Sequence, residues 1–208
     1  MSRLWALLVA LCAAGSVLSA PFLLALLRAA HPPMSPLALL VLQGAQTLVL
    51  CAIAAYAGVR FAPRAGLDAP WLRAIAERRD RPPAFGSMAI ESAAVGSITA
   101  IAVAAVALML RSSVPEALWH PPPGGFWLRA SSAFYGGIVE ETLVRWGLMT
   151  ALIGLGQGAG MREAFWSANA LAGVVFGWMF RRRGLEGAMV AHGAADVWLQ
   201  AALPALLA

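Results

Sequence analysis

The chain alternates between long apolar stretches and short interruptions rich in proline, glycine or charge. A helix needs about 20 mainly apolar residues to cross the hydrocarbon core of a bilayer, and most of these stretches reach or approach that length. They lie at about Leu4–Leu27, Leu37–Gly58, Ile90–Leu110, Ala130–Leu155, Phe165–Phe180 and Leu185–Leu199. The pattern predicts an all-α fold, a polytopic membrane helix bundle with about six apolar segments.

The composition supports a membrane protein. Of the 208 residues, 61% are hydrophobic and 12% are charged, and the mean hydropathy is +0.75. All 15 basic residues are arginine, against 10 acidic residues, and most arginines lie between apolar segments. That placement fits membrane orientation and argues against a nucleic-acid partner. Cys12 and Cys51 fall inside apolar segments and form no C-x-x-C pair, so they predict neither a disulfide framework nor a metal site.

We expect two regions. Residues 1–110 would hold N-terminal transmembrane helices and a basic loop at about 59–88, and residues 111–208 would hold the helices that carry the polar motifs. Six arginines in the loop predict that it faces the cytoplasm. Two spans precede it, so the N-terminus would be cytoplasmic too, and the plasma membrane the location. Met1–Ala20 resembles a signal peptide, but the apolar run resumes past Pro21, which favours a retained helix.

Within the basic loop, the sequence "APWLRAIAERR" places Trp71, Leu72 and Ile75 on one helical face. This pattern predicts a helix lying on an anionic membrane surface, with a solvated loop as the alternative. Counting one crossing per segment puts Arg181–Arg183 outside, against the positive-inside rule. Either a span is miscounted, or a segment re-enters the membrane, or a helix is missing.

Three charges stand in the fourth apolar segment, in "VEETLVRW". Glu141 and Arg145 are four positions apart, in the favoured order for an intrahelical ion pair. Glu140 is turned about 100° away and cannot share that pair. We expect Glu140 to be buried without a partner, which leaves it as a candidate general base. The alternative is an ion pair that only locks the bundle.

A second polar cluster lies in the last apolar segment, in "AMVAHGAADVW". His192 and Asp196 are four positions apart on one face, so Asp196 could orient the imidazole or both could face one ligand. Asn169 is an amide in an apolar stretch and could join helices or donate a hydrogen bond to a reacting carbonyl. Gly173 and Gly177 form a G-x-x-x-G pattern, whose first interpretation is close helix packing.

Together these motifs resemble the CAAX protease and bacteriocin-processing (CPBP, or Abi) family of intramembrane proteases. The family's E-E-x-x-x-R motif corresponds to Glu140, Glu141 and Arg145, and its H-x-x-x-N/D motif to His192 and Asp196. The resemblance covers about Phe134–Leu199, whereas residues 1–110 match only as generic apolar spans. It implies an intramembrane endopeptidase that hydrolyses a membrane-associated peptide or protein, a prenylated CaaX sequence being the family's namesake substrate.

The resemblance also implies roles. Glu140 would activate water, Glu141 with Arg145 would give structural and electrostatic support, and His192 with Asp196 would face the oxyanion. Asp196 is less suited to that task than asparagine, because an ionised carboxylate only accepts hydrogen bonds. Family members are often metal-dependent; a divalent ion such as zinc would have Glu140, His192 and Asp196 as ligands, with water as the fourth.

The chain departs from the family at the middle motif, F-x-x-x-H. Its histidines are His31, His120 and His192, so the middle histidine is absent. Phe165 and Asn169 form a degenerate copy, or the whole helix is missing, which would also explain the orientation conflict. Two alternatives follow: a catalytically impaired membrane scaffold or binding protein, or a proton-coupled transporter with Glu140, His192 and Asp196 as its relay.

Overall fold

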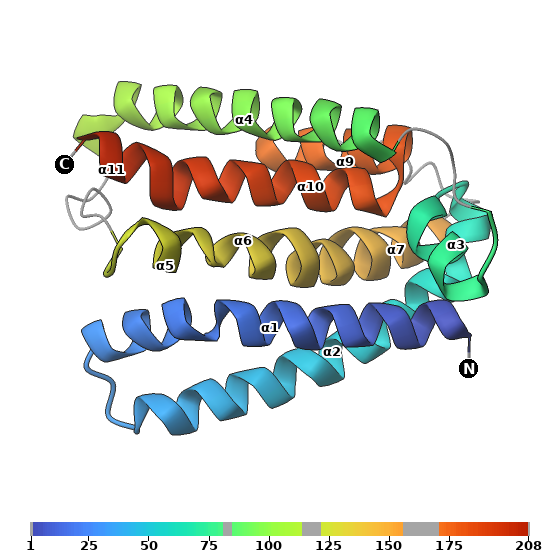
Figure 1. Cartoon of the computed structure of the whole chain (residues 1–208), viewed down its shortest axis with the longest axis horizontal. Coiled ribbons are helices and arrows are strands. Elements are labelled where there is room, and N and C mark those ends of the chain that lie inside the picture. Colours follow the sequence, from blue (N-terminus) through green and yellow to red (C-terminus); the bar gives the residue numbers. More distant parts are fainter. Residues whose placement is uncertain (1, 81–84, 114–121, 156–170, 208) are drawn as a thin grey trace.

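The computed structural model describes residues 2–80, 85–113, 122–155 and 171–207, and all regular structure within these ranges is helical (Figure 1). The predicted all-α fold is confirmed. In chain order the elements are α1 (Arg3–Ala29), α2 (Pro36–Ala65), α3 (Pro70–Glu77), α4 (Phe85–Met109), η1 (Arg111–Ser113), α5 (Phe126–Ala130), α6 (Ser132–Phe134), η3 (Tyr135–Glu140), η4 (Thr142–Met149), α7 (Thr150–Leu155), α9 (Leu171–Arg183), α10 (Leu185–Asp196), η5 (Val197–Ala202) and α11 (Leu203–Leu207).

Three of the described helices, α1, α2 and α4, are long and apolar enough to cross a membrane. They fit an integral membrane protein. The helix α2 continues past the predicted end at Gly58 because arginine is a good helix former and Arg60 and Arg64 extend it. It ends where Gly66 takes a left-handed φ of 66°, a conformation that glycine adopts without strain.

The other predicted segments are not single long apolar helices. The fourth corresponds to α5, α6, η3, η4 and α7 in series, and the sixth to α10 followed by η5. Both η3 and η4 are π-helices. The fifth predicted segment begins at Phe165, outside the described residues, and its described part is α9. Six spanning helices are therefore not found in the described part of the chain.

The core lies around Trp146 of η4, whose side chain is fully buried. Its indole Nε1 donates a hydrogen bond to the carbonyl oxygen of Ala55 in α2, at 3.3 Å. Its ring centroid lies 6.2 Å from that of Phe180 in α9. A side chain at Gly58 would overlap the indole. These contacts hold the π-helical stretch with the E-E-x-x-x-R motif between α2 and α9.

The short helix α3 closes one end of the bundle (Figure 1). The backbone N–H of Leu72 donates to Glu186 Oε1 at 2.6 Å, and the N–H of Leu185 donates to the carbonyl oxygen of Asp68 at 3.1 Å. A helix is present at Pro70–Glu77, so the solvated-loop alternative is wrong for these residues. Its place on a membrane surface stays a prediction. Leu72 and Ala74 are buried against the bundle, whereas Ile75 is 48% exposed.

The positions of the ends of α7 and α9 bear on the orientation conflict. At the end of α7, a Cβ on Gly154 would lie 2.9 Å from Cβ of Phe61, near the C-terminus of α2. At the end of α9, Arg182 and Arg183 both pair with Glu91 in the second turn of α4. Both places lie at the end of the bundle that α3 closes (Figure 1). The described ends of α7 and α9 therefore lie at the same end of the bundle, an arrangement consistent with a miscounted or re-entrant fifth segment.

Apart from Arg145, which is buried inside the bundle, the described arginines segregate between its two ends. The α3 end carries Arg3, Arg60, Arg64, Arg73, Arg78, Arg79, Arg181, Arg182 and Arg183. The opposite end carries Arg28, Arg111 and Arg129. An asymmetry of this size is the usual signature of membrane orientation.

Candidate functional site

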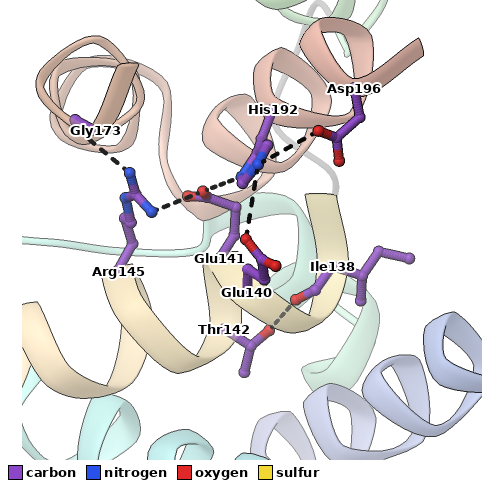
Figure 2. Close-up of polar contacts among 8 residues, drawn as sticks. All are labelled: Ile138, Glu140, Glu141, Thr142, Arg145, Gly173, His192 and Asp196. Atoms are coloured by element: carbon purple, nitrogen blue, oxygen red, sulfur yellow. Dashed lines mark hydrogen bonds and ion pairs between the residues drawn. The ribbon is translucent and has the colours of Figure 1, made fainter. Parts of the chain in front are cut away.

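Five of the polar residues singled out in the sequence meet at one place, between η3–η4 and α10 (Figure 2). Glu140 ends η3, Glu141 separates the two π-helices, and Arg145 lies in η4. His192 and Asp196 lie in the facing helix α10. The sixth, Asn169, lies outside the described residues. The sequence motifs thus converge although about 50 positions separate them along the chain.

Glycines bring these two helices close together. A Cβ on Gly136 would overlap the carboxylate of Asp196 and lie 3.1 Å from Nε2 of His192. A Cβ on Gly137 would lie 2.7 Å from the carbonyl oxygen of Met189. Only a residue without a side chain permits this approach, so the "YGG" sequence before Glu140 positions α10 against the two glutamates.

Arg145, Glu141 and His192 form a continuous buried chain (Figure 2). Arg145 Nη1 lies 3.1 Å from Glu141 Oε1, which confirms the predicted ion pair. The Glu141 side chain is fully buried, and that of Arg145 is 8% exposed. His192 Nδ1 lies 2.7 Å from the same Oε1 atom. One carboxylate oxygen therefore binds both a guanidinium and an imidazole, an arrangement that offsets the cost of burying each charge.

This contact defines the imidazole's orientation. A carboxylate can only accept hydrogen bonds, so Nδ1 of His192 carries the proton that it donates to Glu141. The ring also stacks on Phe176 of α9, with centroids 4.7 Å apart and an angle of 19° between the planes. Arg145 lies over the same phenyl ring, 5.8 Å from its centroid. The second nitrogen, Nε2, consequently faces the remaining two carboxylates.

Glu140 and Asp196 flank that nitrogen without bonding it directly. Nε2 of His192 is 3.9 Å from Glu140 Oε2 and 3.8 Å from Asp196 Oδ1. Both distances exceed a hydrogen bond, and each is suitable for a bridging water or a reacting group.

Glu140 and Asp196 line a cavity of about 220 Å³ whose other walls include Ser19, Gln43 and Gln200. The expected burial of Glu140 is wrong: its side chain is 48% exposed. The reason is the direction in which it leaves the helix. Glu141 points into the bundle towards Arg145, and its neighbour is turned towards the cavity. Glu140 is thus the accessible carboxylate, and Glu141 the enclosed one.

Sequence reasoning paired His192 with Asp196, but the closest carboxylate is that of Glu141. It also missed Phe176 and Gly136. The signals for these two were present as a phenylalanine between the G-x-x-x-G glycines and as a Gly-Gly pair shortly before Glu140. Each signal is common in membrane helices, where close packing is its usual interpretation.

A tetrahedral zinc ion with bonds of about 2.1 Å spaces its ligand atoms by about 3.4 Å. The separations of 3.9 Å and 3.8 Å around Nε2 of His192 are wider than that spacing. Among the described residues, no group of three His, Cys, Asp or Glu side chains has an arrangement suited to a metal ion. A metal site at Glu140, His192 and Asp196 stays a prediction.

Comparison with known proteins adds no further constraint. No protein-family model, no curated protein and no solved structure matches the chain.

Proposed function

We propose that this protein is an intramembrane endopeptidase of the CPBP type, which hydrolyses a peptide bond in a membrane-associated peptide or protein. The observation that carries the proposal is that Glu140 and Asp196, which line one cavity, both lie close to Nε2 of His192. An accessible carboxylate beside an oriented imidazole is the arrangement that general acid–base hydrolysis requires. The resemblance of the two motifs to those of the family supports the same reaction.

In this reaction Glu140 takes a proton from a water molecule, and the oxygen of that water attacks the peptide carbonyl carbon. The oxyanion that forms accepts a hydrogen bond from Nε2–H of the His192 imidazolium. Glu140 then returns its proton to the leaving amine, so that no net proton is consumed. Glu141 does not touch the substrate; it holds Nδ1 of His192 and thereby fixes the direction of Nε2.

The same arrangement suggests how the chain manages without the family's middle histidine. The gap of 3.9 Å between Glu140 Oε2 and His192 Nε2 accommodates a water molecule that contacts both groups. Water activation then needs only residues of η3 and α10. Asp196 completes the pocket by stabilising the imidazolium form through its nearby negative charge.

We propose further that the α3 end, which carries most of the described arginines, faces the cytoplasm of a plasma membrane. Because α1 begins at this end, the N-terminus would be cytoplasmic. The substrate is a peptide or protein of the same bilayer, since the cavity lies between helices and not on a domain facing water.

The decisive experiment replaces Glu140 with glutamine, which keeps the size of the side chain and removes the base. The purified chain in phosphatidylcholine liposomes is incubated with a library of synthetic membrane-associated peptides, and products are identified by mass spectrometry. We expect Glu140→Gln to lower cleavage at least about a hundredfold. The matched control is Glu77→Gln, the same change in α3 at the α3 end of the bundle, which should leave cleavage unchanged.

Unchanged cleavage by Glu140→Gln would assign the base to another residue. If the wild-type chain binds peptides without cutting any of them, the absence of the middle histidine would explain the lost activity. The scaffold alternative would then replace the protease. Proton-coupled flux across the liposome membrane that is lost in Glu140→Gln, without peptide cleavage by the wild type, would instead indicate the transporter.

A further inference from the structure

A second cavity, of about 260 Å³, lies between α1 and α2. The two helices separate towards the turn that joins them, as Figure 1 shows. We refer to this cavity as the α1–α2 groove; its apolar walls include Val17, Leu40, Val41 and Leu48. Val17 is 71% exposed and Val41 is 65% exposed. The groove is therefore open at the side of the bundle, where a membrane helix meets lipid.

The α1–α2 groove adjoins the cavity that Glu140 lines. Four residues line both spaces, namely Ser19, Leu23, Gln43 and Tyr135. The two spaces therefore lie next to each other, between the side of the bundle and the carboxylates. If a linear molecule lay in the groove, the atoms just beyond the groove would lie near Glu140.

The groove also contains polar atoms that a hydrocarbon chain could not bind. The side chain of Gln43, whose amide can both donate and accept hydrogen bonds, lines the groove and is not buried. The hydroxyls of Thr47 and Tyr135 are 3.4 Å apart, a long contact that leaves both able to bind another group. An extended peptide offers one N–H and one C=O per residue and apolar side chains on alternate sides. Its chemistry matches a groove with apolar walls and isolated polar atoms better than an acyl chain does.

We propose that the α1–α2 groove binds an extended apolar segment of a peptide, immediately next to the bond presented to Glu140. Gln43 and Thr47 bind the peptide backbone, and the apolar walls select the side chains. The part of this inference that concerns cleavage rests on the proposed protease function. The part that concerns binding does not, because it requires only that the groove hold a peptide.

The chain offers a well-matched pair of variants for the test. Gly44 lines the groove, and a Cβ added there would meet no atom within 4 Å. Gly44→Leu would therefore fill the groove without displacing its walls, and leucine is a better helix former than glycine. Ala45 is the next residue along α2 and is exposed outside the groove. Ala45→Leu adds a leucine at a neighbouring position without occupying the groove.

Binding is measured on the full chain with Glu140→Gln in phosphatidylcholine liposomes, so that the bound peptide is not cut. The probe is a synthetic peptide with an alternating Leu-Ala half and a polar half that carries a fluorophore. We expect Gly44→Leu to raise the Kd at least about tenfold and Ala45→Leu to leave it unchanged. Gln43→Leu, which keeps the wall but removes the amide, should weaken binding in the same direction.

Equal affinities for the Gly44→Leu and Ala45→Leu chains would overturn the proposal. The proposal would also be overturned if Gly44→Leu released a bound spin-labelled phosphatidylcholine but not the peptide, because the occupant of the groove would then be lipid. If peptide binding depends on the groove but the wild-type chain does not cleave the peptide, the groove proposal is supported and the protease proposal is rejected. Cleavage that Gly44→Leu does not affect would support the protease while rejecting the groove.

Discussion

The Nδ1 atom of His192 lies 2.7 Å from Oε1 of Glu141, although 51 positions separate the two residues. The contact joins the two motifs that the sequence presents separately. It also gives the adjacent glutamates different environments, because Glu141 is enclosed between Arg145 and His192 while Glu140 faces the cavity.

The first prediction concerns the buried ion pair. Arg145→Met keeps an unbranched side chain but leaves Glu141 without its guanidinium partner in a fully buried position. Breaking such a pair costs about 3–5 kcal/mol, so we expect a clear fall in the thermal unfolding temperature in detergent. The double variant Arg145→Met with Glu141→Gln removes the unpaired charge and should regain part of the loss. Equal stability of the single variant and the wild type would show that the pair contributes nothing.

The second prediction concerns helix approach at the site. Gly136→Ala would place a methyl group against the Asp196 carboxylate and push α10 away from η3. We expect cleavage to fall by at least about tenfold, because a small displacement of catalytic groups has large effects on rate. Gly86→Ala, near the start of α4 and outside both cavities, is the control, since a Cβ there meets no atom within 4 Å. Similar activity of the two alanine variants would mean that α10 does not need this close approach.

The third prediction concerns the position of Glu141 as a support for His192. Glu141→Gln keeps an acceptor for Nδ1–H but removes the negative charge that stabilises the imidazolium. In the proposed reaction this change lowers kcat more than it raises KM, because His192 acts on the oxyanion and not on the ground state. It should also shift the basic limb of the pH–rate profile to lower pH. A change in KM alone would assign Glu141 to peptide binding.

The fourth prediction concerns chain orientation. In a background with Cys12→Ala and Cys51→Ala, single cysteines at Arg78 and Arg181 should react with a membrane-impermeant maleimide from the same side of the membrane. A cysteine at Met34, in the turn between α1 and α2, should react from the opposite side. The reason is that Leu155 and Arg183 lie at the same end of the bundle. Labelling of positions 78 and 181 from opposite sides would contradict the fold.

The fifth prediction concerns the attachment of α3. Glu186 accepts the N–H of Leu72 at 2.6 Å, near the start of α3, and is 6% exposed. Glu186→Ala leaves that amide and the helix N-terminus without an acceptor, which costs about 1–3 kcal/mol locally. We expect faster hydrogen exchange at Leu72 and faster proteolysis after Arg78. Glu186→Gln, which still accepts the bond, should protect both positions.

The apolar pattern was sufficient to predict the helical class, the spans near α1, α2 and α4, and the intrahelical pair of Glu141 and Arg145. These features depend on neighbours a few positions away. A run of apolar residues is solvated only by lipid or by other apolar groups, and positions four apart share a helix face whatever the rest of the chain does.

Only the tertiary structure decided which glutamate is accessible, which carboxylate holds His192 and where Arg181–Arg183 lie. Each depends on how helices distant in sequence pack, and no local pattern records that packing. The glycines at 136 and 137 have no side chains to reveal their partners, and yet they set the distance between η3 and α10. The sequence by itself therefore determined the helices and the polar groups that they carry. The packing of α10 against η3 and η4 decided which of those groups meet, because that contact depends on the shapes of two surfaces and not on the spacing along either one.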